Sequence, residues 1–144
     1  GYWFNSVDEG MFDKIMDADR KDYMMCVSCD KEQLGLVSNH AYGLLRAEVV
    51  TDAAGNKCNL VQLRNPWGKT EWSGDWSDNC SKWTEEAKAL CNVTVEDDGL
   101  FWMDFDRDFC KYFPSFPICK TQEGSKLAYM KVEQKPGDYS LFKV

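Results

Sequence analysis

The chain has 144 residues, 44% of them hydrophobic and 28% charged, which is typical of one globular domain with a buried core. Its formal net charge of -7 gives no electrostatic support for nucleic-acid binding. No apolar run reaches the ~20 residues that a membrane-spanning helix needs. An odd number of cysteines, seven, argues against a disulfide framework and favours a reducing compartment, so we expect a cytoplasmic protein.

The first third of the chain predicts one helix followed by a buried strand. Met11, Phe12, Ile15 and Met16 fall on one face at helical spacing, which indicates an amphipathic helix. Residues 23–29 form a continuous apolar run of strand length, as in the central strand of a sheet.

A hairpin is predicted next. Residues 41–50 and 58–64 are strand-like, and the segment between them has turn composition. A loop centred near Ala54 pairs antiparallel residues whose numbers sum to about 108. The numbers of His40 and Asn65 come close to that sum, so we expect these two residues nearly opposite each other at the open end of the hairpin.

The second half reads as a tryptophan-rich loop region and then a helix. Thr84 is placed to cap a short helix over residues 85–90. After the apolar run 100–103, Asp104 is placed to cap a helix that carries aromatic residues at helical spacing: Phe105, Phe109 and Tyr112 or Phe113.

The end of the chain offers two more strands, at residues 127–132 and 139–144. Antiparallel strands with scattered helices indicate an α+β fold rich in β-structure.

His40 is the one histidine of the chain, and a lone histidine is more often structural than functional. Two neighbours favour function: Asn65 is expected to face it, and Trp67 follows Asn65 by two positions. An imidazole that works with a thiol needs an acceptor on its far nitrogen, and Cys-His-Asn is a variant of the catalytic triad. An indole beside that hydrogen bond would exclude water and strengthen it.

Four segments then carry a resemblance to a known family. They are Asn-His-Ala-Tyr at 39–42, Leu-Arg-Asn-Pro-Trp-Gly at 63–68, Glu-Trp-Ser-Gly-Asp-Trp-Ser-Asp at 71–78, and Glu-Asp-Asp-Gly-Leu-Phe-Trp-Met at 96–103. In this order and spacing they resemble the second protease-core subdomain of the calpain family of cysteine proteases, over roughly residues 10–120. Asn39 stands where many relatives have glycine, and Asn tolerates left-handed backbone geometry better than most residues.

The resemblance implies the β-rich half of a papain-like cysteine protease, an antiparallel sheet or barrel with flanking helices. Residues 1–120 would form this subdomain, and residues 121–144 its C-terminal strands or the start of the next domain. His40 would be the catalytic imidazole, Asn65 its orienting partner and Trp67 the indole that shields their contact. The nucleophilic cysteine would lie in the first subdomain of the same full-length chain, so this half alone is expected to be inactive toward a protein or peptide substrate.

The cysteines before His40 do not read as substitutes for that nucleophile. Cys26 and Cys29 lie inside the predicted apolar strand, three positions apart and therefore on opposite faces. We expect them to be core thiols rather than a nucleophile or a zinc pair.

The family pattern also implies a regulatory calcium ion, for which hard oxygen ligands are needed. Its positions fall on Glu71 and Asp78, on the backbone carbonyl of Glu96, and on Asp98. A further acidic ligand falls on Leu100, which has no side-chain oxygen, so the site is expected to be weakened. The alternative that these acids are solvated loop charges stays open.

The resemblance thus implies one half of a calcium-dependent intracellular cysteine endopeptidase. The alternative is a fragment of a calpain-like pseudoprotease that acts as a regulatory or protein-interaction module. The residue at the nucleophile position of the full-length chain separates the two.

Overall fold

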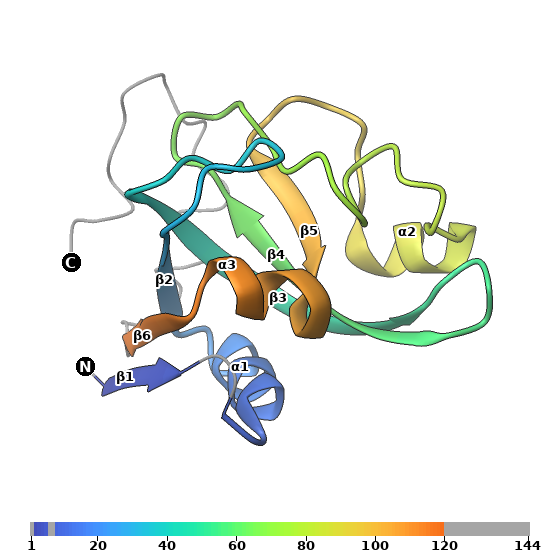
Figure 1. The fold of residues 1–144 in the computed structure, drawn as a ribbon. Coiled ribbons are helices and arrows are strands. Elements are labelled where there is room, and N and C mark those ends of the chain that lie inside the picture. Colours follow the sequence, from blue (N-terminus) through green and yellow to red (C-terminus); the bar gives the residue numbers. More distant parts are fainter. Residues whose placement is uncertain (1, 6–7, 120–144) are drawn as a thin grey trace.

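The computed structural model describes residues 2–5 and 8–119. Its centre is one six-stranded sheet in the order β1-β6-β2-β3-β4-β5, and every neighbouring pair of strands is antiparallel (Figure 1). The strands are β1 (Tyr2–Asn5), β2 (Met24–Cys29), β3 (His40–Thr51), β4 (Lys57–Arg64), β5 (Leu100–Asp104) and β6 (Ser115–Cys119). The predicted α+β class is confirmed, and of the two predicted forms, sheet or barrel, the structure has the antiparallel sheet. The strand predictions at 127–132 and 139–144 lie outside the described residues.

Two helices follow the sequence predictions closely. In α1 (Met11–Arg20) the buried residues include Met11, Phe12 and Ile15, and this helix packs against β3. The helix α2 (Glu85–Cys91) is capped by Thr84 as predicted, because the Thr84 hydroxyl accepts a hydrogen bond from the Ala87 amide at 3.0 Å.

The predicted third helix is present, but its first turn is π-helical. It consists of the π-helical turn η1 (Phe105–Phe109) and the short helix α3 (Cys110–Tyr112). Asp104 caps it as predicted, because its carboxylate accepts from the Arg107 amide at 2.9 Å. The rings of Phe105, Phe109 and Phe113 stack in series, with centroids 5.5 and 5.0 Å apart.

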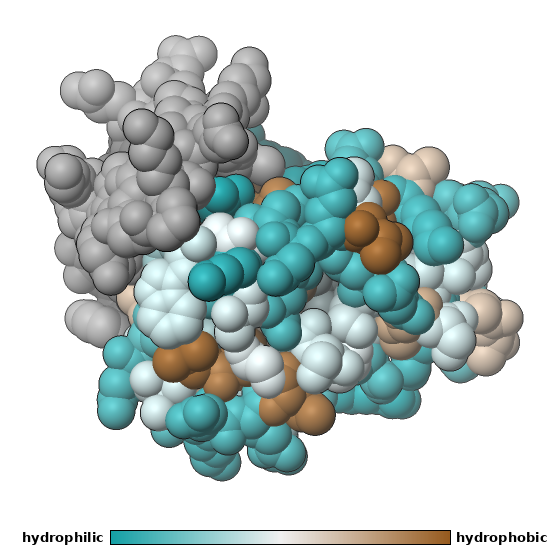
Figure 2. All heavy atoms as spheres, turned by 90° about the horizontal axis from the view of Figure 1, so that it is seen from above, coloured by the Kyte–Doolittle hydropathy of each residue, from teal (hydrophilic) through white to brown (hydrophobic). Residues whose placement is uncertain are grey.

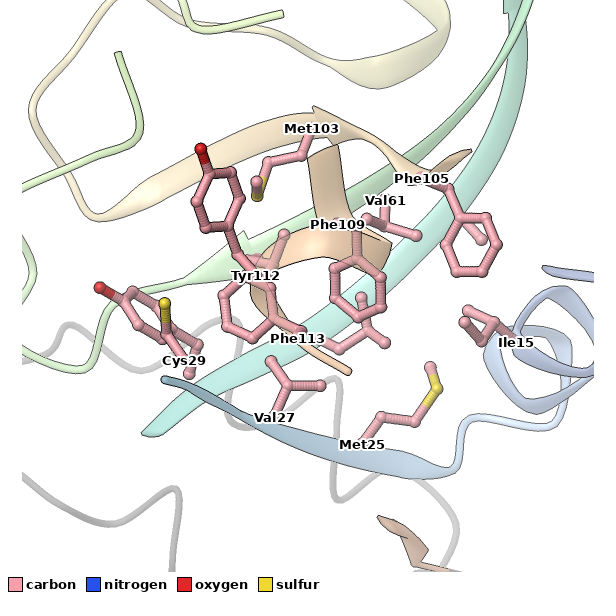
Figure 3. Packing of buried hydrophobic residues seen from close by; sticks show 14 of the residues in the cluster. Ile15, Met25, Val27, Cys29, Val61, Met103, Phe105, Phe109, Tyr112 and Phe113 are labelled. Atoms are coloured by element: carbon pink, nitrogen blue, oxygen red, sulfur yellow. The ribbon is translucent and has the colours of Figure 1, made fainter. Parts of the chain in front are cut away.

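The core lies between the sheet, α1 and the segment after β5 (Figure 3). From β2 the side chains of Met25, Val27 and Cys29 enter it, while Cys26 on the alternate positions is only half-buried. Cys29 is thus a core thiol as predicted, but the same prediction is wrong for Cys26, which lies on the opposite strand face and outside the core. A second cluster packs three indoles, Trp76, Trp83 and Trp102, around α2.

The hairpin of β3 and β4 has the predicted register over most of its length. Pairs from Thr51 opposite Lys57 to Arg46 opposite Gln62 keep the expected sum of residue numbers. The register then shifts by one residue at Leu45, which is a β-bulge, and Leu45 is buried. The shift brings His40, the first residue of β3, closer in register to Asn65, which follows the last residue of β4.

Within the described ranges, no helix is long and apolar enough to cross a membrane.

Candidate active site

His40 lies where β3 begins, on the face of the sheet that carries the core. It is directly opposite Cys29 of β2, and the next pair along, Tyr42 opposite Val27, faces the same core. Asn39 precedes it in the left-handed region, with φ of 53°, and its amide donates to the Cys29 carbonyl at 2.9 Å. The sequence expectation that Asn would tolerate this turn is therefore confirmed.

Asn65 follows the last residue of β4, is fully buried, and makes three hydrogen bonds with its side-chain amide. Its Oδ1 lies 2.9 Å from His40 Nε2 and also accepts from the Trp67 amide at 3.1 Å. Its Nδ2 donates to the Thr70 carbonyl at 3.0 Å. The partners on both sides of the amide fix its orientation, so the atom facing the imidazole is the oxygen.

This orientation determines the tautomer of the imidazole. An amide oxygen only accepts, so Nε2 of His40 must carry the proton, and Nδ1 of the neutral ring then keeps its lone pair. An imidazole held in this way can accept a proton at Nδ1 and return it, which is general acid–base chemistry.

Two aromatic rings enclose the imidazole. The indole of Trp67 lies with its centroid 4.4 Å from that of His40, and the ring of Tyr42 meets the imidazole edge-on at 5.0 Å. Tyr42 is itself fixed, because its hydroxyl accepts from the Val37 amide at 2.9 Å and burial raises its pKa to about 12. The Trp67 indole and the Tyr42 ring thus both lie against the imidazole of the His40–Asn65 pair.

Cys29, opposite His40 in the sheet, is not placed as a nucleophile. Its side chain is buried, its thiol donates to the Lys31 carbonyl at 2.9 Å, and burial raises its pKa. A nucleophilic cysteine needs a lowered pKa and access to substrate.

The predicted calcium ligands lie in the two loops that connect β4 with α2 and α2 with β5. On the face of the molecule seen in Figure 2, hydrophilic residues cover much of the described surface, with scattered hydrophobic ones among them. Glu71, Asp78 and Glu96 line one hollow of about 470 Å³. Burial, and then the negative charge of Asp78, raise the pKa of Glu71 to about 8. Burial likewise raises the pKa of Asp78, and Asp98 adds negative charge to both groups.

These acids do not form a complete metal centre. Among the described residues, no group of three or more His, Cys, Asp or Glu side chains is arranged to hold a metal ion. Asp98 accepts from the Leu100 amide at 2.9 Å, and Leu100 adds no oxygen of its own. Glu71 and Asp78 are partly buried carboxyl groups whose ionisation is disfavoured by burial and by neighbouring negative charge, which a bound cation would offset.

Sequence reasoning missed two residues that support Asn65. Thr70 accepts its Nδ2–H, and Gly99 accepts its backbone amide at 2.8 Å. Gly99 has φ of 86°, and a Cβ there would lie 2.7 Å from the Asn65 carbonyl oxygen, so only glycine fits. Both contacts use backbone carbonyl groups, so the residue type at position 70 does not indicate that it supports Asn65. Only the glycine at position 99 could have indicated a close approach of the backbone.

A β-rich α+β fold whose antiparallel sheet carries a His–Asn pair beside an indole is the arrangement of the histidine half of a papain-like cysteine protease core. The model of the calpain family of cysteine proteases matches residues 3–120, and the chain belongs to this family.

Curated relatives agree with this assignment. The chain is 38% identical over 107 residues to calpain-5 of Mus musculus, a match that covers 67% of the chain and 17% of the relative. It is 42% identical over 86 residues to the calpain-2 catalytic subunit of Mus musculus, covering 58% and 12%. It is also 42% identical over 89 residues to calpain-9 of Homo sapiens, covering 59% and 12%. The matched region therefore spans less than a fifth of each of these relatives.

Proposed function

We propose that this chain is the histidine and asparagine half of the catalytic domain of a calcium-dependent intracellular cysteine endopeptidase of the calpain type. The observation that carries the proposal is the 2.9 Å contact between His40 Nε2 and Asn65 Oδ1 beside the Trp67 indole. Family membership supports the protease class. The nucleophilic cysteine belongs to the first subdomain of the full-length protein.

In the assembled site, Nδ1 of His40 takes the proton of that cysteine thiol, and the thiolate attacks the carbonyl carbon of the substrate peptide bond. The imidazolium then gives its proton to the leaving amine. Asn65 keeps the ring in the required tautomer, as its neutral oxygen accepts from Nε2 throughout. Trp67 excludes water from that hydrogen bond.

Calcium would be held by the carboxylates of Glu71, Asp78 and Asp98 and by the carbonyl of Glu96. Bound there, the ion would neutralise the repelling carboxylates and draw their loops together. The raised pKa of Glu71 supports cation binding at this place, because the neighbouring negative charge that helps to raise it would be offset by a cation that displaces the proton. Leu100 supplies no side-chain oxygen, so we expect the affinity to be lower than with an acidic residue there.

An intracellular, reducing compartment such as the cytoplasm fits the cysteines. In the described part of the chain, Cys29, Cys58, Cys80 and Cys91 are free thiols. Secreted domains of this size tend to pair their cysteines.

The proposal is tested on the full-length protein and on this chain in parallel, with a fluorogenic peptide and calcium. The full-length protein should turn over the peptide, and His40→Ala should lower kcat by on the order of 10³-fold or more. This chain alone should show no turnover. Turnover by the chain alone that a thiol-blocking reagent abolishes would contradict the division of the site between two subdomains.

The same experiment separates the protease from the pseudoprotease alternative. A full-length protein without turnover, and with a residue other than cysteine at the nucleophile position, would assign this half to a regulatory or interaction module instead. Calcium binding is measured separately by calorimetry on this chain, with Asp98→Ala as the variant that should lose the heat of binding.

A further inference from the structure

Thr70 has a backbone conformation that β-branched residues rarely adopt. Its φ is 66°, in the left-handed region, where the branched side chain crowds the backbone. Such a residue persists only where its surroundings fix it, and these positions gather at functional sites.

The surroundings that fix Thr70 are two hydrogen bonds in opposite directions. Its amide donates to Asp97 Oδ1 at 3.0 Å, and its carbonyl accepts from Asn65 Nδ2 at 3.0 Å. The first bond comes from the acidic loop before β5, and the second goes to the partner of the candidate catalytic histidine. Thr70 therefore connects that loop to the His40–Asn65 pair.

The connection determines which atom of Asn65 faces the imidazole. The Asn65 amide has one partner on its nitrogen, the Thr70 carbonyl, and two on its oxygen, His40 Nε2 and the Trp67 amide. If Thr70 returned to the favoured right-handed region, its peptide groups would rotate and the nitrogen of Asn65 would lose its acceptor. The amide would then be held from one side only.

We propose that Thr70 is a positioning residue for His40, and that Asp97 holds it in the left-handed conformation that this role requires. The carbonyl of Thr70 fixes the Asn65 amide, and the amide fixes the Nε2–H tautomer and ring orientation of the imidazole. The role of this connection in catalysis rests on the proposed function. The coupling of Thr70 to the orientation of His40 does not depend on that function.

The single histidine makes the test direct, since every imidazole signal in the spectrum of this chain belongs to His40. The quantity to measure is the rate at which the Nε2–H proton exchanges with water, by nitrogen-15 NMR on the chain without calcium. In Asp97→Ala the rate should rise about tenfold, which corresponds to the loss of about 1.4 kcal/mol, within the range for one hydrogen bond.

Three further variants distinguish positioning from a general loss of stability. Asp97→Asn keeps an acceptor oxygen and should restore the slow exchange. Thr70→Gly keeps the carbonyl and tolerates a positive φ, so it should also exchange slowly. Glu86→Ala removes an exposed carboxylate on α2 and should leave the rate unchanged.

Thr70→Pro is the second disrupting variant, because proline has no amide hydrogen and fixes φ near −65°. It should raise the exchange rate as Asp97→Ala does, with urea unfolding used to confirm that both variants are folded. Asp97 is exposed, so its removal leaves the core intact. Exchange as slow in Asp97→Ala as in the unchanged chain would overturn the proposal, and so would equally fast exchange in Asp97→Ala and Asp97→Asn.

The test needs neither a thiol nor a substrate. Fast exchange in Asp97→Ala with an inactive full-length protein would leave the coupling standing and refute only the proposed protease function.

Discussion

Replacing Asn65 by alanine should cost more stability than its single side-chain amide suggests. The side chain is fully buried and makes three hydrogen bonds, to His40 Nε2, the Trp67 amide and the Thr70 carbonyl. Each such bond contributes about 1 kcal/mol net, so their sum predicts a loss of about 3 kcal/mol in the free energy of unfolding. That is a large part of the 5–15 kcal/mol that holds a typical domain folded, as a rough guide.

Urea unfolding of this chain at neutral pH, followed by tryptophan fluorescence, measures the loss. The matched control is Asn59→Ala on β4, the strand that Asn65 follows, and it removes one solvent-exposed hydrogen bond, to Asp106 at 3.2 Å. It should cost about 0.5 kcal/mol or less beyond the side-chain packing it removes. Equal losses in the two variants would show that the Asn65 contacts contribute nothing special and would refute the account of a structurally fixed imidazole.

Three further predictions concern the loops and helix around the site. The pKa of Glu71 is raised from 4.5 to about 8, so between these pH values the folded chain binds more protons than the unfolded chain, and stability should fall as pH rises through this window. Glu71→Gln should therefore raise the melting temperature at pH 9 without calcium and have little effect near pH 4. Equal stabilisation at both pH values would contradict the assigned cause. Gly35→Ala should cost more than about 2 kcal/mol in urea unfolding, because its Cβ would overlap the Glu71 carbonyl oxygen. Gly55→Ala, also at positive φ but in open space, should cost about 1 kcal/mol. Thr84→Ala should cost about 1 kcal/mol by removing the cap of α2, measured in the same way, and no loss would mean that the cap is replaced by water.

The hairpin shows why much of the site was predictable from sequence. Strand periodicity and turn composition set the pairing of β3 with β4, and that pairing brings His40 near Asn65 at the open end of the hairpin. The bulge at Leu45 was not predictable, because its one-residue shift depends on how the core packs rather than on residue type. The missed bulge did not change the prediction that His40 and Asn65 meet, because it brings the two residues closer in register.

Other features were beyond sequence reasoning for identifiable reasons. The edge strand β1 and its neighbour β6 are short, and Pro117 within β6 argues against a strand when read alone, although it pairs there with Trp3. The support of Asn65 by Thr70 goes through a carbonyl group that every residue type has. The acidic residues were chosen by resemblance, and the structure places Glu71 and Asp78 together without completing a metal centre.

Tyr42 has a consequence for how the protein should respond to heat. Its ring contacts His40 on one side, and Phe101 and Phe113 of the core on the other, at 5.9 and 5.7 Å between centroids. The imidazole therefore rests on the hydrophobic core through Tyr42, in addition to its contacts with Asn65 and Trp67. Warming should leave the geometry of His40 intact until the whole domain melts, so that the imidazole spectrum and the global transition are lost at one temperature.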